Sequence, residues 1–187
     1  MRPGMILILG GARSGKSRLA LDMAHRESGR VLFVATAEPR DPEMRARIEA
    51  HRRERPADWH LLETPLRVGQ NLAGHLDGVQ TVIVDCMSML VANVLLSGPA
   101  VTVAGLEPDA GLEAVRREIG EIVRIPGEHR VCCIVVSNEV GMGIVPDNAL
   151  ARRYRDALGV ANQLLAREAE EVFLMVAGIP LLIKTGS

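Results

Sequence analysis

The residues with the clearest chemical meaning lie near the start of the chain, where a glycine-rich segment ends in a lysine and a serine. This segment fits the phosphate-binding pattern G-x-x-x-x-G-K-S and consists of Gly10, Gly11, Ala12, Arg13, Ser14, Gly15, Lys16 and Ser17. Apolar residues 5–9 precede it, and residues with apolar side chains at helical spacing follow it. In that context backbone N–H groups surround phosphates, Lys16 reaches the outer phosphates, and the Ser17 hydroxyl binds Mg²⁺. A glycine turn that only caps a helix is the alternative; the flanking strand and helix favour a nucleoside triphosphate site.

A second chemical signal is an acidic residue at the end of another apolar segment. Residues 81–84 lead into Asp85, as in proteins where a buried strand delivers a carboxylate to Mg²⁺. Asp85 would also suit the N-cap of the helix expected from residue 87. Because the glycine-rich loop lies in the same chain, we predict that Ser17 and Asp85 are the protein ligands of Mg²⁺.

A basic helix is expected from Asp41, a suitable N-cap before a proline, to about Arg55. Arg47, His51 and Arg55 are spaced by four residues and therefore share one side of this helix. Charged runs usually face water, so one reading is a solvated basic helix. The other is a histidine that faces phosphates and is framed by arginines.

Apolar segments alternate with segments of helical pattern over the whole chain, which predicts an α/β fold. Strands are expected at 5–9, 31–35, 59–63, 81–85 and 131–136, and a terminal hairpin at 172–176 and 181–184. Further helices are expected at 66–76, 87–96 and 112–125, the last ended by Pro126, with a surface loop at 97–111. The prediction is one three-layer domain over residues 1–187, with a mostly parallel sheet and a C-terminal antiparallel hairpin.

Several polar residues follow these strands, so they should meet at the edge of the sheet where such folds bind ligands. They are Thr36, Glu63, Asp85 and Glu139. Residues 137–146 alternate glycine with apolar residues, which is typical of a substrate wall rather than of a flexible linker. We expect Asp147 to cap the helix that follows and Gly159 to allow close packing within it. Its apolar stripe should consist of Leu150, Tyr154, Leu158, Ala161 and Leu165.

The composition excludes some classes of partner. The net charge of −1 gives no field that would attract nucleic acid, and 2% aromatic residues predict an aliphatic core. Cys86, Cys132 and Cys133 lie in or beside apolar runs, as expected of buried thiols in a reducing cytoplasm. Neither a signal peptide nor a membrane-spanning run is recognised, so we expect a cytoplasmic protein.

Motifs from residue 5 to residue 184 together resemble one enzyme family. They are the glycine-rich loop, Ala35-Thr36-Ala37, Glu43-Met44-x-x-Arg47-Ile48-x-x-His51, Arg55-Pro56-x-x-Trp59, Asp85-Cys86, Asn138-Glu139-Val140-Gly141-Met142-Gly143-Ile144-Val145-Pro146 and Asn162-Gln163-Leu164-Leu165-Ala166. The chain resembles the bifunctional adenosylcobinamide kinase / adenosylcobinamide-phosphate guanylyltransferases of cobalamin biosynthesis. The Asn138–Pro146 run is the most specific part of the match.

This resemblance implies two reactions: phosphorylation of the aminopropanol hydroxyl of adenosylcobinamide with ATP or GTP, and transfer of GMP from GTP to that phosphate. It implies that GMP is carried covalently on His51, and that the protein is a RecA-like homotrimer. Beyond the glycine-rich loop, the nucleotide-binding residues predicted in this sequence are Ala35, Thr36, Ala37, Arg52, Arg53, Glu54, Arg55, Glu63 and Asp85.

Two other readings remain open at this stage. A monofunctional P-loop kinase would use the glycine-rich loop and leave His51 without a role. A nucleotide-dependent switch protein would bind partners instead, although the sequence has no Asn-Lys-x-Asp guanine-reading motif. Glu63 and Glu139 are both candidates for the base in phosphorylation.

Overall fold

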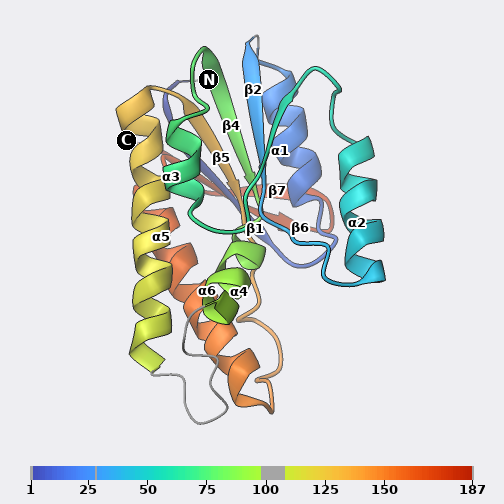
Figure 1. Ribbon diagram of the computed structural model, residues 1–187, viewed down its shortest axis with the longest axis vertical. Coiled ribbons are helices and arrows are strands. Elements are labelled where there is room, and N and C mark those ends of the chain that lie inside the picture. The colour runs from blue at the N-terminus through green and yellow to red at the C-terminus, as the bar shows by residue number, and fades with distance from the viewer. Residues whose placement is uncertain (1, 28, 98–107, 187) are drawn as a thin grey trace.

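The computed structural model describes residues 2–27, 29–97 and 108–186, and a seven-stranded sheet forms its centre (Figure 1). The strands are β1 (Gly4–Gly10), β2 (Arg30–Ala35), β3 (His60–Glu63), β4 (Val79–Asp85), β5 (Cys132–Val136), β6 (Glu171–Val176) and β7 (Ile179–Lys184). Their order is β3-β2-β4-β5-β1-β6-β7, and every neighbouring pair is parallel except β6 and β7. The predicted parallel sheet with an antiparallel hairpin at its edge is therefore confirmed.

The central strands are continuously apolar because helices cover both faces of the sheet. Successive side chains point to opposite faces. On one face, Leu7 and its neighbours pack with α3 (Val68–Ala73), α4 (Met87–Ser97), α5 (Pro108–His129) and α6 (Ala149–Glu168). On the other, Ile8 and its neighbours pack with α1 (Lys16–His25). This arrangement is the predicted three-layer α/β fold.

The remaining helix, α2 (Pro42–Arg53), lies outside these layers at the right-hand edge of Figure 1. Asp41 caps it as predicted, since its carboxylate accepts a hydrogen bond from the Met44 N–H at 2.7 Å. None of its side chains is buried. Its contribution to the molecule is therefore the charged side chains that it presents rather than core packing.

Three sequence-based boundaries were wrong. The helix α5 does not stop before Pro126 but continues to His129, because a proline in the last turn removes only one backbone hydrogen bond and its ring is buried here. It also begins at Pro108, so residues 108–111 of the predicted loop are helical, while residues 98–107 lie outside the described part of the chain. The helix α3 is shorter than the predicted 66–76.

The helix α6 also differs from the prediction. Asn148, not Asp147, is its N-cap, and the Asn148 side chain accepts a hydrogen bond from the Ala151 N–H at 2.8 Å. Leu150 is 47% exposed and does not join the buried stripe. A Cβ at Gly159 would meet no atom within 4 Å, so close packing does not explain this glycine.

Two of the three cysteines lie in the core and one lies beside the site. Cys132 and Cys133 are buried in β5, as predicted, whereas Cys86 is half-buried just after β4. Within residues 2–27, 29–97 and 108–186, no helix combines the length and apolar character needed to cross a bilayer.

Candidate nucleotide-binding site

The glycine-rich loop joins β1 to α1 and is fixed by neighbours on two sides. The Glu139 N–H donates to the Gly10 carbonyl at 3.0 Å, and the Gly178 N–H donates to the Ser14 carbonyl at 3.1 Å. Gly10 has a φ of 151°, and a Cβ there would lie 2.6 Å from the Met175 carbonyl oxygen. Any side chain at Gly10 would therefore displace either the loop or β6.

Lys16 is buried at the start of α1, and its ammonium crosses the loop to donate to the Gly11 carbonyl at 2.6 Å. Burial lowers the pKa of Lys16, while the neighbouring Cys86 and Asp85 oppose that shift. The positive charge is thus held inside the curve of the loop, where a phosphate group would meet it with little competing water.

Asp85 lies at the carboxyl end of β4, and its side chain forms a hydrogen bond with Ser17. Burial raises the pKa of Asp85, and the Ser17 hydroxyl, His51, Lys16 and Arg55 act in the opposite direction. The adjacent hydroxyl and carboxylate oxygens suit Mg²⁺, which binds few protein ligands and completes its octahedron with phosphates and water. Among the described residues no cluster of three or more His, Cys, Asp or Glu is suited to hold a metal. A metal at this point would therefore need phosphate oxygens as further ligands.

Charges at the basic end of α2 act on this same carboxylate. His51 is half-buried and interacts electrostatically with Asp85, as Arg47 does with Lys16. The Arg55 guanidinium lies over the Phe33 ring, 4.4 Å from its centroid, which fixes a cation beside the site. His51 and Arg55 therefore both act electrostatically on Asp85, and the interpretation that this histidine faces phosphates remains a prediction.

The other charged residues of this segment have different surroundings. Arg52 donates to Glu63 at 3.1 Å and to Glu49 at 3.3 Å, so it ties α2 to the end of β3. Arg53 and Glu54 are exposed at the end of the helix. Their predicted contacts with nucleotide remain predictions.

Thr36 has a structural part in the site. It is fully buried; its hydroxyl donates to the Cys86 carbonyl at 2.7 Å and accepts from the Cys86 N–H at 3.0 Å. Its own carbonyl accepts from the Asn93 amide at 2.8 Å. Thr36 therefore holds the turn that follows Asp85, and the nucleotide contacts predicted for Ala35, Thr36 and Ala37 remain predictions.

Both predicted candidates for the catalytic base are paired within the protein. The Glu139 carboxylate accepts from the Gly141 N–H at 2.5 Å, and Glu63 accepts from Arg52. Asp85, in contrast, is the carboxylate beside Ser17 and Lys16.

A hydrogen-bonded chain behind the site was not predicted as part of it. The Ser137 hydroxyl donates to Asn162 at 2.6 Å, and the Asn162 amide donates to the Asn138 carbonyl at 3.0 Å. The Asn138 amide donates to the Ser88 hydroxyl at 3.0 Å, which also contacts the Cys86 sulfur at 2.9 Å. The available signal was the presence of polar residues on helix faces that are otherwise apolar, such as Ser88 in α4 and Asn162 in α6.

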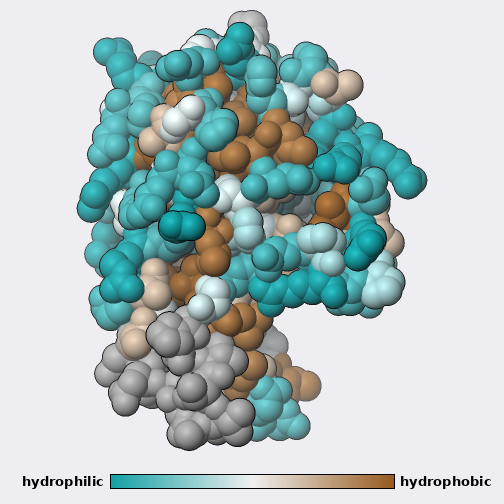
Figure 2. Space-filling model, in the orientation of Figure 1, coloured by the Kyte–Doolittle hydropathy of each residue, from teal (hydrophilic) through white to brown (hydrophobic). Residues whose placement is uncertain are grey.

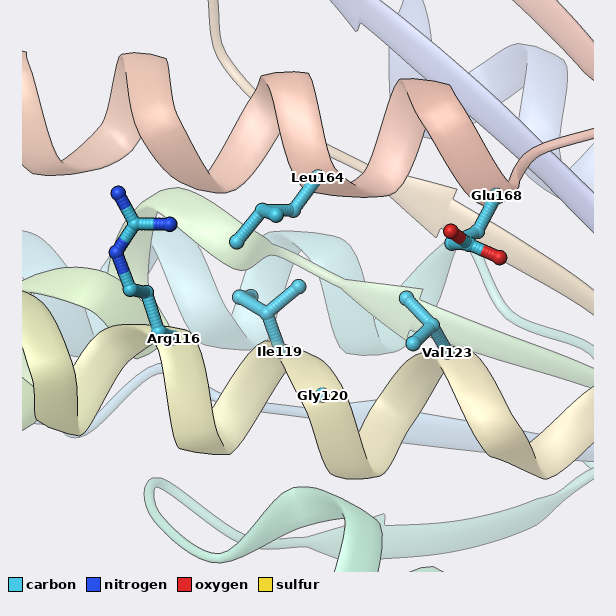
Figure 3. Close-up of a pocket in the computed structure, with 6 residues that line it drawn as sticks. All are labelled: Arg116, Ile119, Gly120, Val123, Leu164 and Glu168. Atoms are coloured by element: carbon cyan, nitrogen blue, oxygen red, sulfur yellow. The ribbon is translucent and has the colours of Figure 1, made fainter.

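A separate hollow lies between α5 and α6, away from the glycine-rich loop (Figure 3). Figure 3 shows Ile119 and Val123 of α5 facing Leu164 of α6, with Arg116 and Glu168 at the two ends. Since α6 starts at the site edge and runs to the opposite edge, its last turns are remote from the glycine-rich loop. None of the predicted site residues lines this hollow.

The parallel sheet, the glycine-rich loop before α1 and the carboxylate at the end of β4 define a P-loop nucleotide-binding fold. Comparison with known proteins makes the assignment more specific. The sequence model of the family "Cobinamide kinase / cobinamide phosphate guanyltransferase" matches residues 6–183, and the chain belongs to this family.

Curated relatives cover nearly the full length of the chain. The bifunctional adenosylcobalamin biosynthesis protein CobP of Pseudomonas aeruginosa is 42% identical over 178 residues, which are 95% of this chain and 96% of the relative. Proteins named CobU from Escherichia coli and Salmonella typhimurium are 39% and 38% identical, over 96% of this chain and 99% of each relative. The family resemblance inferred from the motifs is thereby confirmed.

Proposed function

We propose that this chain catalyses both reactions named by its family. In the first, the aminopropanol hydroxyl of adenosylcobinamide takes the γ-phosphoryl group of ATP or GTP. In the second, the product's phosphate takes GMP from GTP, which yields adenosylcobinamide-GDP and pyrophosphate. The observation that supports the proposal is the electrostatic interaction of His51, in the last turn of α2, with Asp85, whose side chain pairs with Ser17 of the glycine-rich loop.

His51 supplies a nucleophile for the second reaction. An imidazole nitrogen attacks the α-phosphorus of GTP, so that an N–P bond forms and the bond to pyrophosphate breaks. A phosphate oxygen of the corrinoid then attacks the same phosphorus, the N–P bond breaks, and the histidine is regenerated. No such intermediate is needed for phosphorylation, where the hydroxyl oxygen attacks the γ-phosphorus in line, its proton is released, and the bond to the departing nucleoside diphosphate breaks.

Charge on the phosphate oxygens is offset by cations already at the site. Lys16 lies across the loop, and Arg55 is held over Phe33. Ser17 and Asp85 would hold Mg²⁺, which when bound neutralises charge on the triphosphate and orients it. Because Lys16 and Arg55 are fixed by contacts within the protein, charge that develops on the phosphates can be offset with little reorganisation.

A cytoplasmic homotrimer remains part of the proposal. What supports an association of subunits in this chain is the edge strand β7, where Ile179, Leu181, Leu182 and Ile183 are between 48% and 63% exposed. An apolar edge strand of this kind is usually covered by another chain. Sedimentation equilibrium of the purified protein measures the number of subunits directly.

The decisive experiment is incubation with α-³²P-labelled GTP and Mg²⁺, followed by denaturing electrophoresis. We expect the unmodified protein to retain label in an acid-labile, alkali-stable form, as a phosphoramidate does. His51→Ala should take up no label yet still convert adenosylcobinamide to its phosphate. No side chain of α2 is buried, so removal of the His51 imidazole should leave the glycine-rich loop intact.

His60→Ala is the matched control, since His60 is an exposed histidine on β3, and it should label normally. Label that persists in His51→Ala would move the nucleophile elsewhere. Corrinoid phosphorylation without any labelling of the unmodified protein would identify a monofunctional kinase, and the absence of both activities would favour a nucleotide switch.

A further inference from the structure

The segment between β5 and α6 exposes large apolar side chains beside the nucleotide site. Met142 is 81% exposed, Ile144 is 97% exposed, and Val145 is 61% exposed. Water contact of this extent costs free energy that a bound apolar surface would recover. We call residues 139–147 the apolar loop.

Both ends of the apolar loop are fixed. The Glu139 N–H donates to Gly10 of the glycine-rich loop at 3.0 Å. At the other end, the Arg152 guanidinium donates to the carbonyls of Pro146 at 2.9 Å and Asp147 at 2.7 Å. The apolar side chains are therefore carried by a segment tied to the phosphate site at one end and to α6 at the other.

An apolar groove lies between α4 and the first turns of α6, and Asn148, the residue after the apolar loop, forms part of its lining. It has a volume of about 240 Å³ and is lined by Ala92, Leu95, Leu96, Leu150, Ala151 and Tyr154, together with the capping residue Asn148. Figure 2 shows hydrophobic surface in the lower half of the molecule, over the region that α4 and α6 occupy in Figure 1. Leu150 is exposed because it lines this groove, whereas the helical pattern placed it in an apolar stripe.

Hydrogen bonds connect the groove to the reacting edge of the sheet. Tyr154, which lines the groove, forms a hydrogen bond with Ser88, and Ser88 contacts the Cys86 sulfur at 2.9 Å. Cys86 directly follows Asp85 in the chain. Side-chain contacts therefore link the groove to the residue that follows Asp85, the carboxylate that we assign to the metal and phosphate site.

We propose that the groove and the apolar loop together bind the corrin ring of adenosylcobinamide and its phosphate, an inference that rests on the proposed function. The acceptor must place one hydroxyl at the phosphate site while a broad macrocycle edged with methyl groups and amides lies nearby. Binding pockets for small molecules usually span about 300–1,000 Å³, so the groove accommodates one edge of this ligand, and the apolar loop covers more of it. A contact between two copies of the chain would not require a connection to Asp85, which favours the corrinoid as occupant.

The test uses Ile144→Asp and Leu150→Asp, each compared with a conservative variant at the same position, Ile144→Leu and Leu150→Met. Both positions are exposed, and an acidic residue in the first turn of α6 suits the helix dipole, so folding should be retained. Binding of adenosylcobinamide is measured by equilibrium dialysis from its visible absorbance, and KM is measured in the kinase reaction.

We expect each aspartate variant to raise the Kd and KM for adenosylcobinamide about tenfold or more, since it removes a buried apolar contact from the complex. The conservative variants should stay within about twofold of the unmodified protein. Formation of the GMP adduct from labelled GTP needs no corrinoid and should proceed at the normal rate in all variants.

Unchanged corrinoid affinity in both aspartate variants would overturn the proposal, and a simultaneous change in sedimentation would assign the face to a subunit contact. Failure of the proposed function is recognised separately. It would show as an unmodified protein that forms no adduct and no corrinoid phosphate, whereas failure of this inference leaves both reactions intact.

Discussion

Replacement of Asn162 by leucine tests the buried hydrogen-bonded chain behind the site. Asn162 is 6% exposed and forms two hydrogen bonds, one from the Ser137 hydroxyl at 2.6 Å and one to the Asn138 carbonyl at 3.0 Å. Leucine has a similar size but no polar atoms. It would leave the fully buried Ser137 hydroxyl without this partner and would release the Asn138 carbonyl at a partly exposed position.

The expected loss follows from these two bonds. A buried hydroxyl deprived of its partner costs about 1–3 kcal/mol, and the bond to the more accessible carbonyl contributes about 1 kcal/mol. We therefore expect Asn162→Leu to lower the free energy of unfolding by about 2–4 kcal/mol, measured by urea denaturation at 25 °C. Because Asn138 also donates to Ser88, kcat/KM for the corrinoid should fall as well.

A double-mutant cycle separates the orphaned hydroxyl from other effects. In Ser137→Ala/Asn162→Leu the unpaired hydroxyl is gone, so the double variant should be more stable than the sum of the two single losses predicts, by about 1 kcal/mol or more. A loss below about 1 kcal/mol in Asn162→Leu, or strictly additive losses in the cycle, would refute the reasoning.

Two further predictions concern charge. Asp85→Asn should slow Mg²⁺-dependent adduct formation about 100-fold or more, while the thermal midpoint changes by less than about 3 °C. Burial of the Asp85 carboxylate opposes its charged form, so this charge adds little to stability, and asparagine keeps the shape of the side chain. Equal losses of activity and stability would favour a structural role instead. Burial raises the pKa of the Cys132 thiol from 9.0 to about 11. Between pH 9 and pH 11 the folded state therefore keeps the thiol proton that the unfolded state loses. The stabilisation, about 2–3 kcal/mol, is complete below pH 9 and is lost as the pH rises toward 11. Urea denaturation at pH 8.5 and 10.5 under reducing conditions measures this loss, which should shrink in Cys132→Ala; an equal pH dependence in that variant would assign the loss to other groups.

The sequence by itself determined the features that depend on short stretches of chain. The glycine-rich loop could be predicted because its glycines, lysine and serine act within eight consecutive residues. The apolar runs at 5–9, 81–85 and 131–136 predicted buried strands, and the hairpin at the C-terminus followed from two apolar runs around Gly178. Asp85 could be placed at the ligand-binding edge because the carboxyl ends of parallel strands share that edge.

Only the tertiary structure decided which distant side chains meet. Ser88 and Asn138 are 50 residues apart, and Ser137 and Asn162 are 25 apart, so their hydrogen bonds depend on the neighbouring positions of β4 and β5 and on the path of α6. Helical periodicity assigned Leu150 to a buried stripe, yet the groove beside α4 leaves it exposed. Periodicity states which side chains share a face of a helix, whereas the packing of neighbouring elements determines how far along that face burial extends.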